Sequence, residues 1–388
     1  MKNGKVLILS EKFGTGHEKA AISILKGIKK VSPDTGVRII NFFHYCQPYF
    51  SRMTLNLYLK ALDIRPEIWG YFYERERNKK RATFPKKMIQ MGASSILRKI
   101  IEKEAPDVIV CTHPFPCCVA SRLKRRGQLF ALAEVITDFD VHGFWINEGV
   151  DAYLVAHEIM IEPMLKFGVD ADKIFATGIP IDPNFDVFKG KNAVKKTLGF
   201  DKGLPVLLMA GGGLGLSGID GVLVETLARE PLQIAVICGK NRLARRRLED
   251  VTAKKALDNV KVYGFVENMW DFMEAADLMI TKAGGLTMAE ALTRELPIII
   301  YNPLPGQEER NARFLLRNGA ARYARDRDVL IKLVRDMLLN EKKLLHLKSR
   351  GLRLKKTGSA QKAAEIVLDL MEKNNSGWCH GIRKTEGS

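Results

Sequence analysis

Short apolar runs alternate with amphipathic segments along most of this sequence. The runs VLIL at 6–9 and DVIVC at 107–111 are apolar almost throughout, which is typical of strands covered on both faces. Segments with a helical period, such as Glu18–Lys30, separate the runs. This alternation predicts an α/β fold in which helices cover both faces of parallel sheets.

The alternation is interrupted at residues 177–191. This segment, TGIPIDPNFDVFKGK, carries prolines and glycines without helical period, which predicts a linker. We therefore predict two doubly wound Rossmann-like domains, at 1–180 and 181–355, that face an interdomain cleft. The expected strands are at 6–9, 37–41, 108–112, 132–137, 152–156 and 174–176, and then at 206–210, 234–238, 260–263, 278–281 and 298–301. Helical period continues over 329–373, and the polar tail from Asn374 is expected to be disordered.

The charge balance favours a polyanionic partner. The 388-residue chain has 62 Lys and Arg against 44 Asp and Glu, a net charge of +18. Either a nucleic acid or an anionic membrane suits this balance, and a solvated surface that aids solubility is the simpler alternative. Because the sequence carries no nucleic-acid-binding motif, we expect anionic membrane lipids, and no nucleic acid, as partners.

Neither a membrane-spanning segment nor a disulfide framework is expected. The apolar runs are shorter than the roughly 18–20 residues that span a bilayer, and Val6–Leu9 is too short for a signal-peptide core. The six cysteines are scattered without a CxxC pair, which is typical of a reducing compartment. We expect a cytoplasmic protein, peripheral at the cytoplasmic face of the cell membrane.

The motif Gly14-Thr15-Gly16-His17 lies between the first expected strand and the first expected helix. Glycines permit a tight turn and a close approach to a ligand, and N–H groups at a helix start attract anions. A histidine at this position can take a proton from a hydroxyl group, because its pKa is near working pH. A capping or packing role for His17 is the alternative.

Glycine-rich turns follow two expected strands of the second domain. The turn at 211–215, GGGLG, follows VLLMA and precedes a helix, which is typical of a phosphate cradle. It has neither the GK[ST] of a P-loop nor the GxGxxG spacing. The turn in Thr281–Glu290 leads into a helix whose Glu290 can accept hydrogen bonds from both ribose hydroxyls. Alternatively, Glu290 is a glutamate favoured by the helix dipole.

One further segment suits the binding of a sugar, and another suits contact with a membrane. The segment Pro303–Glu309 combines an amide with carboxylates, which match the donors and acceptors of a sugar, although a plain polar loop is the alternative. The stretch Phe42–Tyr73 is rich in aromatic residues and is followed by basic residues at 75–87. Such a pairing suits the headgroup boundary of an anionic membrane, and two helices packed on the core are the alternative.

The pair Asp138 and Asp140 in DFD follows the expected strand at 132–137. A DxD pair can hold a divalent ion on a sugar diphosphate. This one is far from the glycine-rich motifs, so we expect no metal ion and no cofactor. Asp138 can instead orient His17 or the acceptor.

Several segments resemble the diacylglycerol glycosyltransferases of glycosyltransferase family 28, which include monogalactosyldiacylglycerol synthases and bacterial diacylglycerol glucosyltransferases. They are VITDF, TGIPIDPNF, MAGGGLG, ICGKN, YGFVENM, ITKAGGLTMAEAL and PLPGQEERNA, in that order, and span about residues 4–330. The resemblance implies a GT-B fold and an inverting transfer of sugar from UDP-glucose or UDP-galactose to diacylglycerol. It also implies that 356–388 holds a helix that returns to the first domain.

The resemblance assigns roles residue by residue. His17 is implied as the base or as part of the acceptor site, with Asp138 near it, and Glu290 as the ligand of the ribose. The implied contacts to the diphosphate of the donor are Gly212, Gly213, Lys282, Gly284, Gly285 and Thr287. The implied contacts to the uracil are Phe265, Val266 and Met269, and those to the sugar are Gln307 and Glu308. Two residues of ICGKN, Gly239 and Asn241, are also implied to contact the donor.

Two positions depart from the family pattern. Asp182 stands where relatives often carry Arg, and Ser217 where many continue with glycine, which leaves donor choice and domain closure open. The alternatives are a UDP-GlcNAc transferase acting on a polyprenyl-diphosphate lipid, a UDP-sugar epimerase of the same fold, and a non-catalytic UDP-sugar sensor.

Overall fold

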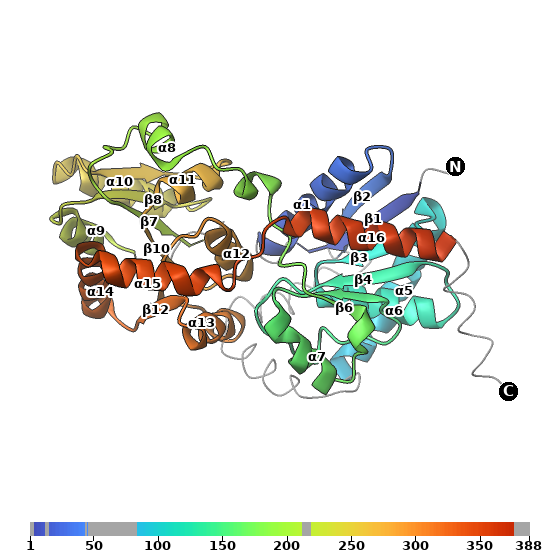
Figure 1. The fold of residues 1–388 in the computed structure, drawn as a ribbon. Coiled ribbons are helices and arrows are strands. Elements are labelled where there is room, and N and C mark those ends of the chain that lie inside the picture. Colours follow the sequence, from blue (N-terminus) through green and yellow to red (C-terminus); the bar gives the residue numbers. More distant parts are fainter. Residues whose placement is uncertain (1–3, 12–14, 43–44, 46–83, 212–218, 376–388) are drawn as a thin grey trace. The chain divides into compact units, whose positions relative to one another are not determined.

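The computed structural model describes residues 4–11, 15–42, 45, 84–211 and 219–375 (Figure 1). The chain divides into two compact units, one with Met1–Pro183 and Gly358–Ser388 and the other with Asn184–Thr357. Within the described ranges, none of the helices combines the length and the apolar composition needed to cross a membrane. The first two residues of the expected disordered tail, Asn374 and Asn375, end the last helix, and the rest of the tail lies outside the described residues. Most of the expected membrane-binding stretch also lies outside them.

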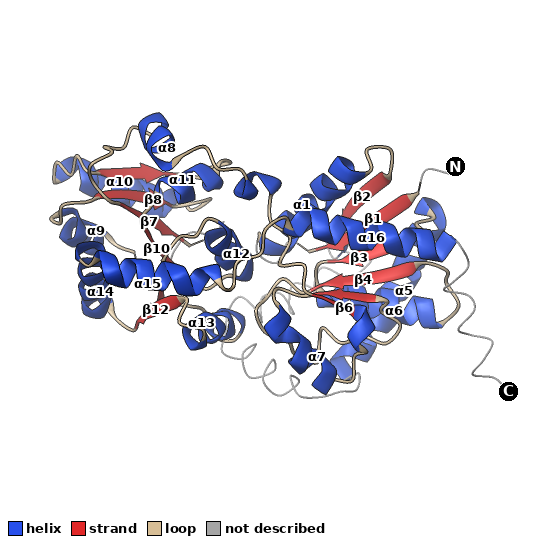
Figure 2. Ribbon diagram, in the orientation of Figure 1, coloured by secondary structure: helices blue, strands red, loops and turns tan. Residues whose placement is uncertain are grey.

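Six strands form the sheet of the first unit: β1 (Lys5–Ser10), β2 (Gly36–Asn41), β3 (Val108–Cys111), β4 (Ala131–Val135), β5 (Ala152–Leu154) and β6 (Ile174–Phe175). All are parallel, in the order β2-β1-β3-β4-β5-β6. Figure 2 shows β2, β1, β3 and β4 in this sheet. Strands β3 and β4 are buried at every position, because helices cover both faces of the sheet.

Helices α1 (Gly16–Val31) and α16 (Ser359–Asn375) pack against each other and on this sheet. Their apolar residues join alternate residues of β1, β3 and β4 in one core. Helix α6 (Pro114–Arg125) packs on β3 and β4 outside that core, with α5 (Phe84–Glu104) beside it. The α1–α16 contact is close at Gly27, where a Cβ would lie 2.2 Å from the carbonyl oxygen of Ala360. The end of the chain thus completes the core of the first unit.

Shorter elements of this unit are η1 (Glu158–Met160), α7 (Ile161–Lys166) and η2 (Ala171–Lys173).

The second unit has the same kind of sheet. Its strands are β7 (Val206–Ala210), β8 (Gln233–Ile237), β9 (Val260–Tyr263), β10 (Leu278–Thr281), β11 (Ile298–Tyr301) and β12 (Ala321–Ala324). They are parallel, in the order β12-β11-β10-β7-β8-β9. The helices are α8 (Lys191–Thr197), α9 (Gly221–Ala228), α10 (Arg242–Lys254), α11 (Met269–Ala275), α12 (Gly285–Thr293), α13 (Gln307–Arg317), α14 (Arg327–Leu339) and α15 (Glu341–Leu352), with η3 (Pro183–Asp186) at the start.

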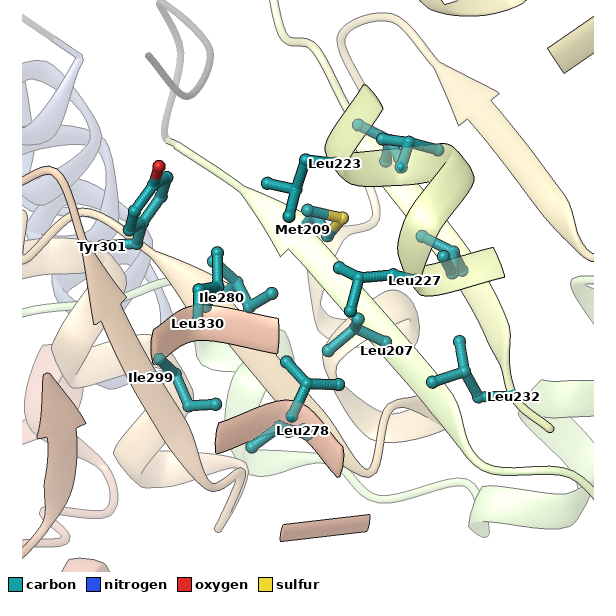
Figure 3. Close-up of a cluster of buried hydrophobic side chains, with 14 of the residues drawn as sticks. Leu207, Met209, Leu223, Leu227, Leu232, Leu278, Ile280, Ile299, Tyr301 and Leu330 are labelled. Atoms are coloured by element: carbon teal, nitrogen blue, oxygen red, sulfur yellow. The ribbon is translucent and has the colours of Figure 1, made fainter. Parts of the chain in front are cut away.

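One face of the second sheet carries a hydrophobic core. Alternate residues of β7, β10 and β11 meet α9 and α14 there, as Figure 3 shows for Leu207, Leu227 and Leu330. All three side chains are fully buried. The two parallel-sheet units confirm the predicted α/β fold class.

Strand β12 is one that the apolar runs do not predict. Its sequence ARYA has a partly buried Arg322 and a Tyr323 that is 46% exposed. Because β12 pairs with β11 at the end of the strand order, its outer side needs no apolar cover.

Each sheet has a topological switch point, from which successive strands are added in opposite directions. It lies between β1 and β3 in the first unit and between β7 and β10 in the second. In open parallel sheets, ligands bind outside the carboxyl ends of the strands at such points. His17 follows β1, and Lys282 follows β10. Predicted site residues thus lie at the switch point of each unit.

A buried ion pair between Arg294 and Glu274 links the start of the second unit to the end of α12. The Arg294 side chain is fully buried, and its Nη1 lies 3.2 Å from Oε2 of Glu274. Its Nη2 donates to the carbonyl oxygen of Asn184 at 2.8 Å. Oε1 of Glu274 accepts from the backbone N–H groups of Lys189 and Gly190 at 2.8 and 2.6 Å. The segment 184–190 therefore depends on this pair.

We predict that Arg294→Ala lowers the free energy of unfolding by about 3–5 kcal/mol, because Glu274 keeps a buried charge without its cation. The measurement is urea unfolding followed by circular dichroism. Arg335→Ala is the matched control, since Arg335 pairs with Glu230 with half of its side chain exposed. The control should lose at most about 1 kcal/mol. Equal losses in the two variants would contradict the account.

Candidate active site

His17 lies at the switch point of the first sheet, in the first turn of α1. Its Nδ1 is 2.7 Å from the carbonyl oxygen of Thr112, which follows β3. It is also 3.0 Å from Oγ1 of Thr137, beyond the end of β4. These partners are 95 and 120 residues further along the chain, so the orientation of the ring depends on the strand order of the sheet.

The carbonyl group of Thr112 decides which nitrogen of His17 carries the proton. A carbonyl oxygen only accepts hydrogen bonds, so Nδ1 must be the donor. In the neutral ring, Nε2 then has the lone pair. This is the tautomer that a general base needs when it takes a proton through Nε2. The backbone carbonyl of Thr112 thus fixes both the tautomer and the orientation of the His17 ring.

Burial lowers the pKa of His17 from 6.5 to about 4, and the hydrogen bond to the Thr112 carbonyl raises it by a smaller amount. His17 is therefore neutral at pH 7. The neutral imidazole, which is the form that can accept a proton, is thus the form present at that pH.

Two more imidazoles lie at this edge of the sheet. The ring of His113 is 4.7 Å from that of His17 between centroids, at an interplanar angle of 78°. His142 is in the loop after β4 and is 6% exposed. Burial holds the pKa of His113 well below its ordinary value, and the neighbouring His17 and His142 add to the effect. The three histidines come from different strand ends, so the GTGH motif alone does not indicate the cluster.

Asp138, predicted to orient His17 or the acceptor, directly follows Thr137 and is 1% exposed. The Nδ1 contacts of His17 described above come from Thr112 and Thr137, which the sequence reasoning did not single out. The available signal was that each is a polar residue at the end of an apolar run. A role for Asp138 stays a prediction. In the part of the chain that the structure describes, no group of three or more His, Cys, Asp or Glu side chains could hold a metal ion.

The predicted phosphate-binding residues of the second unit lie at the end of β10 and the start of α12. Lys282 is 9% exposed, and its Nζ lies 3.9 Å from Oε1 of Glu308. Gly284 is the N-cap of α12, Gly285 is its first residue, and Thr287 lies in its first turn. An ammonium group beside the N–H groups of a helix start suits an anion. Gly212 and Gly213, also predicted to contact the diphosphate, lie outside the described residues.

The predicted ribose and sugar ligands belong to α12 and α13. Glu290 lies in the second turn of α12 and is 4% exposed. Gln307 is exposed at the start of α13, and Glu308 follows it. Oε2 of Glu308 accepts from the backbone N–H of Leu304 at 2.7 Å. The Glu308 carboxylate is thus held in place by Leu304 and lies near Lys282.

The predicted uracil-binding residues follow β9. Phe265 is 50% exposed, and Nζ of Lys240 lies 6.0 Å from the centroid of its ring. Val266 is partly buried, and Met269 begins α11. An exposed aromatic ring at the carboxyl edge of a sheet is available for a planar base to stack on.

Gly239 and Asn241 follow β8. Gly239 has φ 59, a left-handed conformation that favours glycine. Oδ1 of Asn241 accepts from the backbone N–H of Ala244 at 3.0 Å and caps α10. Both residues thus have a structural reason to be there, whether or not they contact a donor.

Solved structures of the same fold include a glycosyltransferase from Rickettsia africae ESF-5, with a TM-score of 0.52 and 14% identity, over 99% of this chain and 100% of that one. The chain is similar to MurG from Acinetobacter baumannii, with a TM-score of 0.62 and 17% identity, over 94% of this chain and 99% of that one. It is also similar to TcCGT1 in complex with UDP, with a TM-score of 0.61 and 13% identity, over 96% of this chain and 100% of that one. Two Rossmann-like units with these neighbours define the GT-B class, as the sequence predicts.

Sequence comparison then identifies the family. Residues 17–181 match monogalactosyldiacylglycerol (MGDG) synthase, and residues 211–366 match the glycosyltransferase family 28 C-terminal domain. The chain is 33% identical over 384 residues to the processive diacylglycerol beta-glucosyltransferase of Bacillus thuringiensis (strain Al Hakam), over 97% of this chain and 95% of the relative. The chain belongs to this family of diacylglycerol glycosyltransferases and is an enzyme, which confirms the resemblance.

The lowered pKa of His17 predicts an unusual pH dependence of turnover. His17 gains a proton, and Nε2 loses its lone pair, only as the pH falls through about 4. We therefore expect kcat/KM to show no titration of His17 between about pH 6 and 8, because kcat/KM reports the groups of the free enzyme. The measurement is kcat/KM across this range. A fall in kcat/KM with an apparent pKa near 6.5, the ordinary value of histidine, would contradict the assignment.

Proposed function

We propose that the enzyme transfers glucose or galactose from UDP-glucose or UDP-galactose to the hydroxyl group of 1,2-diacylglycerol, with inversion at the anomeric carbon. The product is a β-glycosyldiacylglycerol. The observation that carries the proposal is the neutral imidazole of His17, fixed with its proton on Nδ1. A single displacement needs one base for the attacking hydroxyl and no enzyme nucleophile. The family membership of the chain supports diacylglycerol as the acceptor.

His17 receives the proton of the acceptor hydroxyl on Nε2. The hydroxyl oxygen attacks the anomeric carbon from the face opposite to UDP and forms the new glycosidic bond. The bond from the anomeric carbon to the diphosphate breaks, and UDP leaves with the electron pair. Asp138 is proposed to orient the acceptor or His17 during this step.

The second unit holds the donor and stabilises the leaving group. Lys282 and the N–H groups at the start of α12 offset the negative charge that develops on UDP, so the proposal assigns no step to a metal ion or cofactor. Glu290 binds the ribose, and Phe265 stacks on the uracil. The remaining proposed contacts are Gly212, Gly213, Gly284, Gly285 and Thr287 to the diphosphate, Val266 and Met269 to the uracil, Gln307 and Glu308 to the sugar, and Gly239 and Asn241 beside the nucleotide.

The acceptor is a membrane lipid, so we propose that the enzyme works as a peripheral protein at the cytoplasmic face of the membrane. The net charge of +18 supports contact with anionic lipids. The aromatic and basic residues of 42–87 are the proposed contact.

The test is transfer of radiolabelled sugar from UDP-glucose and, separately, from UDP-galactose to diacylglycerol in anionic-lipid vesicles. His17→Ala should lower kcat by about 10²–10⁴-fold, because the general base is lost, and should leave UDP binding unchanged. Glu290→Ala should raise the Kd for UDP by about 10–100-fold, because hydrogen bonds to a charged group are lost. The controls are His346→Ala and Glu341→Ala, which change exposed side chains of α15.

Glycolipid from one donor would name the sugar. An unchanged kcat in His17→Ala would overturn the base assignment. UDP binding without diacylglycerol product, together with transfer from UDP-GlcNAc to a polyprenyl-diphosphate lipid, would replace the proposed acceptor with the polyprenyl lipid.

A further inference from the structure

Two of the contacts of His113 point to different roles. It is the N-cap of α6, where its Nδ1 accepts from the backbone N–H of Phe115 at 3.2 Å. Its ring also meets the ring of His17 edge-on, with centroids 4.7 Å apart. The side chain is 8% exposed, so both contacts are made in a largely buried environment.

Capping alone does not require an imidazole at this position. Asn, Asp, Ser and Thr are the preferred N-cap residues, and histidine is not among them. The same chain uses the same cap at His157, whose Nδ1 accepts from the N–H of Ile159 at 3.2 Å at the start of η1. His113 differs from His157 in the ring contacts that it makes, with His17 and with Phe115.

The place of Nε2 depends on the rotation of the His17 ring about its Cβ–Cγ bond. The contacts of Nδ1 to Thr112 and Thr137 oppose that rotation on one side of the bond. An aromatic ring packed edge-on, at an interplanar angle of 78°, restricts this rotation. His113 is suited to the task because it is itself held by the cap of α6.

We propose that His113 is a positioning residue for the transfer reaction, whose ring holds the imidazole of His17 in the orientation that accepts the proton of the lipid hydroxyl. The proposal rests on the proposed role of His17 as the base. His113 transfers no proton and contacts no substrate in this account. Its neutral state supports the assignment, because a charged neighbour would disfavour the protonation of His17 during the reaction.

Two substitutions separate the ring from the cap. His113→Asn keeps an acceptor for the helix N–H groups, because Asn is a preferred N-cap, but it removes the ring. His113→Phe keeps an aromatic ring beside His17 but removes the acceptor. A role in capping alone and a role in positioning therefore predict opposite orders of activity for the two variants.

We expect His113→Asn to keep the wild-type UDP affinity, to lower Tm modestly because a smaller side chain replaces a buried ring, and to lower kcat by about 10²-fold, the scale of a small misplacement of a catalytic group. We expect His113→Phe to lower Tm by about 2–4 °C through loss of the cap, and yet to keep a higher kcat than His113→Asn. The measurements are thermal unfolding, UDP binding and kcat in the vesicle assay. His157→Asn is the matched control and should leave kcat unchanged.

A double variant shows whether the effect passes through His17. In the His17→Ala background, His113→Asn should cause no further loss of kcat, because the group that it positions is absent. A kcat of His113→Phe at or below that of His113→Asn would overturn the proposal, and so would additive losses in the double variant. An active His17→Ala enzyme would instead overturn the base assignment, which keeps the two failures distinct.

Discussion

The carboxyl ends of parallel strands share one edge of a sheet, and the proposed chemistry depends on that edge in both units. The strand pairings are parallel in each sheet, and each sheet has a switch point beside its central strands. In the first unit this geometry brings Thr112 and Thr137 to Nδ1 of His17. In the second it places Lys282 and the start of α12 beyond β10. A change in strand order would separate these groups while leaving each local motif intact.

The environment of His17 has two opposite effects on its action as a base. A pKa of about 4 ensures that the ring is neutral at pH 7, but it also makes the ring a weaker base than a histidine with an ordinary pKa. Such a base gains more from accurate placement than from its intrinsic affinity for a proton. The fixed backbone carbonyl of Thr112 and the buried ring of His113 both serve placement, which is consistent with a site that relies on geometry.

Sequence reasoning predicts best where a residue has one local reason for its identity. The strands at 206–210, 278–281 and 298–301 are matched residue for residue, because burial on both faces requires continuous apolar runs. The strand at 260–263 is also matched, although it is only partly buried. The glycines at 284 and 285 can be predicted from the sequence for a similar reason, since they begin a helix shortly after a strand. The edge strand β12 cannot be predicted from apolar runs, because its less buried positions accept Arg322 and Tyr323.

The missed residues act through groups that composition does not reveal. Thr112 orients His17 with its backbone carbonyl, which any residue type would supply, and Thr137 reaches the same nitrogen from another strand. The pair of Arg294 and Glu274 has no sequence signature, because it holds backbone atoms of a segment about a hundred residues earlier. Such contacts follow from the strand order and become visible only when the sheet is assembled.

The most direct test of this account is the protonation state of His17. Nitrogen-15 NMR of the imidazole rings distinguishes a nitrogen that carries a proton from one with a lone pair, and comparison with a His17→Gln variant assigns the signals. The account predicts a neutral ring at pH 7 with the proton on Nδ1 and the lone pair on Nε2. A charged ring at pH 7, or a neutral ring with the proton on Nε2, would contradict it.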